Sequence, residues 1–192
     1  MNQNHLNEYV KRAYETACRH GFHDKERPIE HWLMLIITEV AEMVEADRKG
    51  KHAQVAMFKR ESVTPQPDEN RQKHWRFCFE TFIKDTVEDE MADVCIRLFD
   101  LAGLKGWKIE VGHSDELEER CFGFFRCRTC TESAWELCRQ LTPLYSFQKI
   151  DAEVVLYYIE CWSKFLGIDL EWHINQKLEY NEHRAKMHGK KY

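Results

Sequence analysis

The sequence has no excess of positive charge and no long apolar run. It sets 28 Lys and Arg against 33 Asp and Glu, a formal charge of −5, which excludes a global attraction to nucleic-acid polymers or anionic membranes. Nowhere do eighteen apolar residues follow one another, as a membrane-spanning helix requires. The first twenty residues also lack a hydrophobic signal core, and we therefore expect a cytoplasmic protein without membrane contact.

Strand-like alternation, internal repeats and low-complexity tracts are also absent from the sequence. Almost every apolar pattern instead has the helical period. With 43% apolar and 32% charged residues over 192 positions, the chain is long and apolar enough to bury one core. We expect one all-α domain over 1–192, a helical bundle.

Start and stop signals predict five helices, at about 2–20, 28–50, 75–104, 151–167 and from 169 into the basic tail at 184–192. Gly21, Gly50 and Gly167 provide stops, and Asp151 and Asp169 are candidate N-caps. The pattern weakens over 51–73, where Pro65 to Asn70 indicate a loop. Residues 107–149 form an expected irregular insertion with a short helix near 132–141, closed by Pro143.

Two of these helices carry acidic residues three positions apart. Glu39 and Glu42 lie in the helix expected at 28–50, and Glu90 and Asp93 in the helix expected at 75–104. Residues three apart share one helix face. Both pairs border apolar core positions, where an unpaired carboxylate is costly. If the two helices pack antiparallel, the four carboxylates meet.

Four carboxylates, with no His or Cys inside either motif, suit magnesium or manganese better than zinc or copper. Magnesium keeps part of its water shell and bridges phosphate oxygens, so a phosphate-bearing substrate is the natural partner. Acids three apart are also common on solvated helix faces, which is the alternative interpretation.

The segments Leu35–Ala46 and Glu88–Val94 resemble the MazG-like all-α nucleoside triphosphate pyrophosphohydrolases, which carry Glu-x-x-Glu on one helix and Glu-x-x-Asp-Val on another. The chain departs in having Thr38 where the family often has a further Glu, and in the longer separation of its motifs. The resemblance implies hydrolysis of a nucleoside triphosphate to the monophosphate and pyrophosphate. It also implies that one acid positions water and that four acids bind the metal, namely Glu39, Glu42, Glu90 and Asp93.

The last helix and one aromatic residue supply candidate substrate contacts. One helical stripe holds Ile174, Lys177, Asn181, Arg184 and His188. The resemblance implies that Lys177, Asn181 and Arg184 contact the phosphates, and the alternative is a solvated basic face. Trp32, with His31, is the candidate wall for the base, although Trp32 suits the core equally well.

The resemblance also implies a homo-oligomer, with a dimer as the expected form, because relatives build the nucleotide pocket where bundles from two chains meet. Apolar residues off the main helical stripes are consistent with such a surface, namely Ile37, Val44 and Phe99.

Other metals and a non-catalytic role give competing hypotheses. Cys121, Cys127, Cys130 and Cys138 gather within 107–149, but their spacing matches no common zinc motif, and free thiols are the alternative. A di-iron carboxylate bundle needs two Glu-x-x-His pairs, and the sequence offers only the one ending at His113. A metal-binding or interaction module without activity is the remaining alternative.

Overall fold

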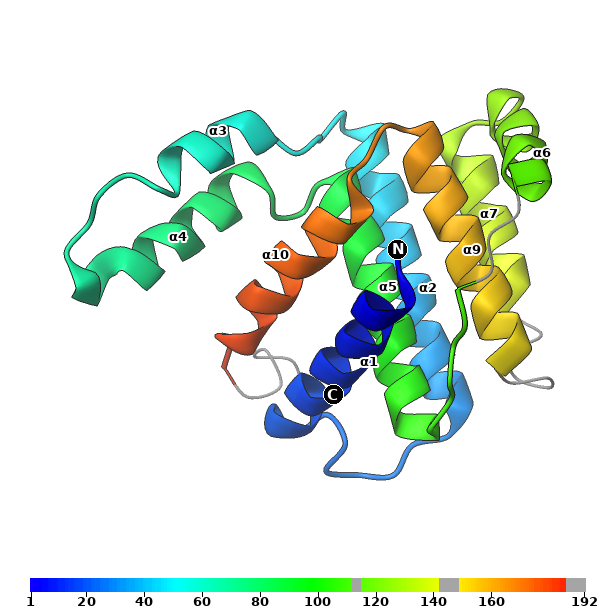
Figure 1. Cartoon of the computed structure of the whole chain (residues 1–192), viewed down its shortest axis with the longest axis horizontal. Helices are drawn as coiled ribbons and strands as arrows, with labels where there is room; N and C mark the ends of the chain where they lie inside the picture. Colours follow the sequence, from blue (N-terminus) through cyan, green and yellow to red (C-terminus); the bar gives the residue numbers. More distant parts are fainter. Residues whose placement is uncertain (112–114, 142–148, 186–192) are drawn as a thin grey trace.

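The computed structural model of the chain describes residues 1–111, 115–141 and 149–185. Its regular structure within these ranges is entirely helical, which confirms the predicted all-α class. The helix α5 (Val87–Lys105) is central (Figure 1). It packs against α1 (Gln3–Arg19), α2 (Ile29–Arg48), α9 (Lys149–Phe165) and α10 (Leu170–Glu182). None of the helices in these ranges combines the length and apolar character needed to cross a membrane.

Local capping explains where several helices begin and end. At the start of α5 the Thr86 side chain accepts a hydrogen bond from the Asp89 amide. At the start of α10 the predicted N-cap, Asp169, accepts one from the Trp172 amide. The predicted glycine stops have positive φ, between 63° and 79°, which is a conformation that glycine adopts without strain; they are Gly21, Gly50 and Gly167.

The two motif helices run in opposite directions (Figure 1). The chain just after α2 lies beside the start of α5, because the Val87 amide donates to the Lys51 carbonyl at 3.1 Å. A second bond, from the Gln54 amide to the Phe82 carbonyl at 2.8 Å, ties the same junction together. The predicted antiparallel arrangement of the acid-bearing helices is therefore present.

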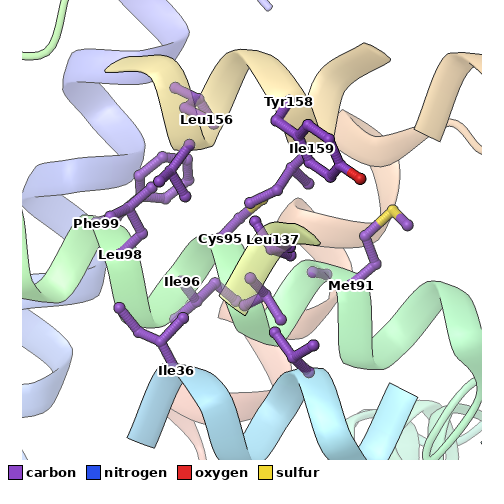
Figure 2. Packing of buried hydrophobic residues seen from close by; sticks show 14 of the residues in the cluster. Ile36, Met91, Cys95, Ile96, Leu98, Phe99, Leu137, Leu156, Tyr158 and Ile159 are labelled. Atoms are coloured by element: carbon purple, nitrogen blue, oxygen red, sulfur yellow. The ribbon is translucent and has the colours of Figure 1, made fainter. Parts of the chain in front are cut away.

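One continuous core holds the bundle together. Figure 2 shows side chains of α2, α5, α7 (Cys130–Leu141) and α9 meeting in it. Ile36, Leu98 and Ile159 are fully buried there, and Leu137 is nearly so. Burying a side chain of this size contributes about 1.5–3 kcal/mol, so this packing fixes the position of α2 relative to α5 and of the acids they carry.

The stretch predicted as a loop after Gly50 contains two helices. These are α3 (Val55–Glu61) and α4 (Asp68–Phe82), which form an arm that projects from the bundle (Figure 1). The arm has a small core of its own, composed of Phe58, Cys78, Phe79, Ile83 and, from α10, Tyr180. The prediction of one helix over 75–104 was also wrong, because a turn at 83–86 separates α4 from α5.

The segment predicted as an irregular insertion is mostly helical where it is described. It contains α6 (Asp115–Arg126), which was not predicted, and α7, which matches the expected short helix near 132–141. The helix α7 packs against α2 and α9. Residues 142–148, including Pro143, lie outside the described ranges. The helix α9 begins at Lys149, so Asp151 lies inside it and is not the predicted N-cap.

Candidate metal and phosphate site

Three of the four motif acids converge between α2 and α5. One carboxylate oxygen each from Glu39, Glu42 and Glu90 lies within 4.8 Å of the others. Glu39 and Glu90 are buried, whereas Glu42 is exposed. The group therefore has an inner wall of two buried acids and a third acid at its open side.

A pocket of about 300 Å³ opens over these acids, a volume at the lower end of small-molecule sites. The fourth motif acid, Asp93, also lines it. Basic side chains from three parts of the chain face the same space, namely Lys84, Arg97, Lys177 and Arg184. Another part of the wall comes from α1 and the turn after it, through Ala13, Thr16, Ala17, His20 and Phe22.

Arg97 neutralises one of the two buried acids. Its Nε donates to Glu39 Oε1 at 2.9 Å, and both side chains are largely buried. Burial and the nearby charge of Asp93 raise the pKa of Glu39, and the charge and hydrogen bond of Arg97 oppose that rise. Burial lowers the pKa of Arg97, but the charges of Glu39 and Asp93 outweigh burial and raise it. Arg97 is therefore the counter-ion of Glu39.

Lys177 is bound by carboxylates of α5. Its Nζ lies 2.6 Å from Asp89 Oδ2 and 2.7 Å from Asp93 Oδ2, and its side chain is 4% exposed. Burial raises the pKa of Asp89 to about 6, against the opposing charge of Lys177. Lys177 also lines the pocket, but its ammonium group is already held by two acids; its role as a phosphate contact stays a prediction.

Glu90 is a buried acid with one carboxylate oxygen that no described residue satisfies. Its side chain is buried, and Oε2 has no hydrogen-bond partner among the described residues. Burial, together with the charge of Asp93, raises the pKa of Glu90 to about 9. A divalent cation would satisfy the orphaned oxygen and favour the ionised carboxylate, and the all-oxygen donor set fits a hard cation.

Two further predicted contacts, Asn181 and Arg184, lie in the pocket. Asn181 and Arg184 line it from α10 and the residues after it, and Asn181 Oδ1 is a buried acceptor without a partner among the described residues. The Arg184 guanidinium stands 5.5 Å from the centroid of the Tyr180 ring. His188, the last residue of the predicted stripe, lies outside the described ranges.

Trp32 was predicted to form a wall for a base, but it belongs to the core. It is buried and is not among the residues that line the pocket. Its ring packs against His23 and His31, with centroids 4.8 Å and 5.0 Å away. Phe22 is the aromatic residue that lines the pocket from the turn after α1.

Several residues of the pocket were not selected from the sequence. Arg97 and Asp100 follow Asp93 by four and seven positions and so share its face of α5, a signal that the sequence does contain. Asp100 Oδ1 lies 2.7 Å from His23 Nε2. Lys84 and Asp85 come from the turn before α5, which the predicted unbroken helix concealed.

The competing metal hypotheses receive no structural support. Across the described ranges, Glu39, Glu42 and Glu90 form the one group of His, Cys, Asp or Glu placed to share an ion. The four clustered cysteines form no such group, and all eight cysteines are free thiols. His113, needed for the di-iron motif, lies outside the described ranges.

In comparisons with known proteins, no family model, curated protein or solved structure matched the chain.

Proposed function

We propose that the protein is a magnesium-dependent nucleoside triphosphate pyrophosphohydrolase, releasing the monophosphate and pyrophosphate. The observation that carries the proposal is the convergence of Glu39, Glu42 and Glu90 within 4.8 Å, with an orphaned oxygen on buried Glu90. An acid cluster alone is common on protein surfaces, but a buried carboxylate without a partner is costly. The same residues carry the sequence resemblance to the MazG-like enzymes.

The charge of the pocket supports a metal between the protein and an anionic substrate. The lining has six carboxyl groups against four Lys and Arg side chains, so a triphosphate alone would meet net repulsion. Magnesium, or manganese, when bound would offset the phosphate charge and lower the pKa of a bound water. Glu39, Glu42 and Glu90 would hold it. Asp93 leaves Oδ1 to complete the site or to orient the attacking water, since Lys177 holds its Oδ2.

The two sides of the pocket suit the two ends of a nucleotide. Asn181 and Arg184 provide polar groups near the acids, and a guanidinium group suits phosphate oxygens. The α1 wall contributes the aliphatic surface of Ala13 and Ala17 and the ring of Phe22, against which a sugar and a base can pack. We therefore assign the base to the α1 side in place of Trp32.

A homo-oligomer, with a dimer as its simplest form, and a cytoplasmic location remain part of the proposal. Ile37 and Val44 are only partly buried, and Met34 on the same helix is 57% exposed. Phe99 gives no support, because it is fully buried within the chain. Light scattering at assay concentration checks the oligomer, and an active monomer would contradict it.

The decisive experiment is a panel of ribo- and deoxynucleoside triphosphates with magnesium, following pyrophosphate release. We expect activity on at least one nucleotide and none after chelation. Glu39→Gln and Asp93→Asn should each abolish turnover while helical content persists, since each removes charge from the site. Glu45→Gln is the matched control, because Glu45 is exposed on α2 and lies outside the pocket.

Two outcomes would overturn the proposal. One is near-normal turnover of either site variant at saturating magnesium. The other is a protein inactive on the whole panel that carries tightly bound zinc or iron, which would favour the non-catalytic module or an iron protein.

A further inference from the structure

The four basic side chains of the pocket differ in how firmly they are already bound. Lys177 is held by Asp89 and Asp93, and Arg97 is held by Glu39. Releasing either cation would leave a buried carboxylate without its partner, which is strongly unfavourable. These two cations are therefore committed to the protein, and an arriving anion must be met by Lys84 or Arg184.

Lys84 has a partner that it can exchange at low cost. Its ammonium group pairs with the neighbouring Asp85, whose side chain is 56% exposed, while that of Lys84 is 30% exposed. Ion pairs open to solvent contribute little to stability. An incoming phosphate can replace Asp85 at Lys84 without leaving a charge buried.

The turn that carries Lys84 is held in an unusual conformation by the buried part of the site. Asp85 has φ of 59°, the one positive value among the described non-glycine residues, and such positions are often functional. Its amide donates to Asp89 Oδ2 at 3.0 Å, the same oxygen that Lys177 contacts. The Asp89–Lys177 pair thus fixes the backbone from which Lys84 reaches the pocket.

We propose that Lys84 is a substrate-binding residue, which exchanges Asp85 for the anionic phosphate chain of the ligand. The assignment rests on the proposed function for the identity of the ligand, a polyphosphate ester. It replaces Lys177 in that role, and Lys177 instead holds the turn through Asp89.

Calorimetric titration with inorganic tripolyphosphate in saturating magnesium tests the assignment without requiring turnover. Lys84→Met should weaken binding about tenfold, the lower end expected for a charged hydrogen bond because Lys84 is partly exposed. Lys84→Arg should retain most of the affinity. Lys105→Met is the matched control, because Lys105 is exposed in the last turn of α5, outside the pocket. It should bind as the wild type does.

A gain of binding provides the second test. Asp85→Asn keeps a residue that tolerates positive φ but removes the competing carboxylate, and should tighten tripolyphosphate binding roughly two- to fivefold. That gain should shrink in the Lys84→Met background. The assignment is overturned if Lys84→Met binds as tightly as Lys105→Met, if the gain is unchanged without Lys84, or if the wild type binds no tripolyphosphate. Lys84-dependent binding in a protein that hydrolyses no nucleotide would support Lys84 and refute the hydrolase.

Discussion

Replacing Arg97 by methionine should destabilise the protein by about 3 kcal/mol, because Glu39 would stay buried without its cationic partner. The ion pair joins Arg97 Nε to Glu39 Oε1 at 2.9 Å, and the two side chains are only 18% and 5% exposed, respectively. The pair therefore falls outside the range of about 0.2–1 kcal/mol that applies to surface pairs. This value of about 3 kcal/mol is the lower end of the cost of breaking a buried ion pair. We choose it because burial and Asp93 already raise the pKa of Glu39, so Glu39 can take up a proton when Arg97 is removed.

Urea unfolding at neutral pH, with a thermal melt beside it, measures this loss. A change of 3 kcal/mol corresponds to a fall in Tm of roughly 6–12 °C for a chain of this size. Arg48→Met is the control, since Arg48 forms an exposed pair with Glu45, and should change stability by less than about 0.5 kcal/mol. Glu39→Gln combined with Arg97→Met should cost less than Arg97→Met alone, because no buried charge is then left unpaired.

Magnesium connects this stability test to the proposed site. A cation at Glu39 would replace the lost charge of Arg97, so magnesium should stabilise Arg97→Met more than the wild type. An unchanged urea midpoint and m-value in Arg97→Met would refute the electrostatic reasoning. Equal stabilisation of both proteins by magnesium would place the ion away from Glu39.

Three further predictions concern packing, pH and substrate contact. Gly103→Ala should destabilise by about 1–3 kcal/mol, since an added Cβ would lie 2.5 Å from a side-chain atom of α1; Gly123→Ala, with open space around it, should be neutral or stabilising in the same urea assay. Without magnesium, Glu90 favours the folded state at low pH and disfavours it as pH rises from its ordinary pKa of 4.5 towards about 9. Stability should therefore fall over this window by up to about 1.4 kcal/mol per pH unit, and Glu90→Gln should flatten the profile measured by thermal melts. Arg184→Ala should lower kcat/KM roughly ten- to a hundredfold for every accepted nucleotide, and a changed base preference with activity preserved would place Arg184 beside the base.

The helical class was predictable because its signals are local. Asp169 caps α10 and Gly21 ends the first helix, and both signals act within one turn of the chain. The break before α5 was missed because apolar residues continue across it at helical spacing, from Ile83 to Val87 and Met91. Thr86 was the local sign of a new helix start. The helix α6 was missed although Leu117, Cys121 and Phe124 recur at helical spacing.

The composition of the site was only partly predictable, because spacing defines a face and not the partner that meets it. Glu39, Glu42 and Glu90, which the motif spacing selects, lie close together between α2 and α5 in the structure. The bonds of Lys177 to Asp89 and Asp93 depend on how α10 lies across α5, which is a tertiary property. Burial of Trp32 depends in the same way on the turn that brings His23 beside it.

The projecting arm and the pocket share one helix, α10, so we expect their equilibria to be linked. Tyr180 stacks on Phe79 of the arm with ring centroids 4.6 Å apart, and the next residue, Asn181, lines the pocket. A molecule that rearranged the arm would thus alter pocket affinity, and by reciprocity a pocket ligand would alter the opening equilibrium of the arm. Slower amide hydrogen exchange in α4 on ligand binding is the expected sign of that reciprocity.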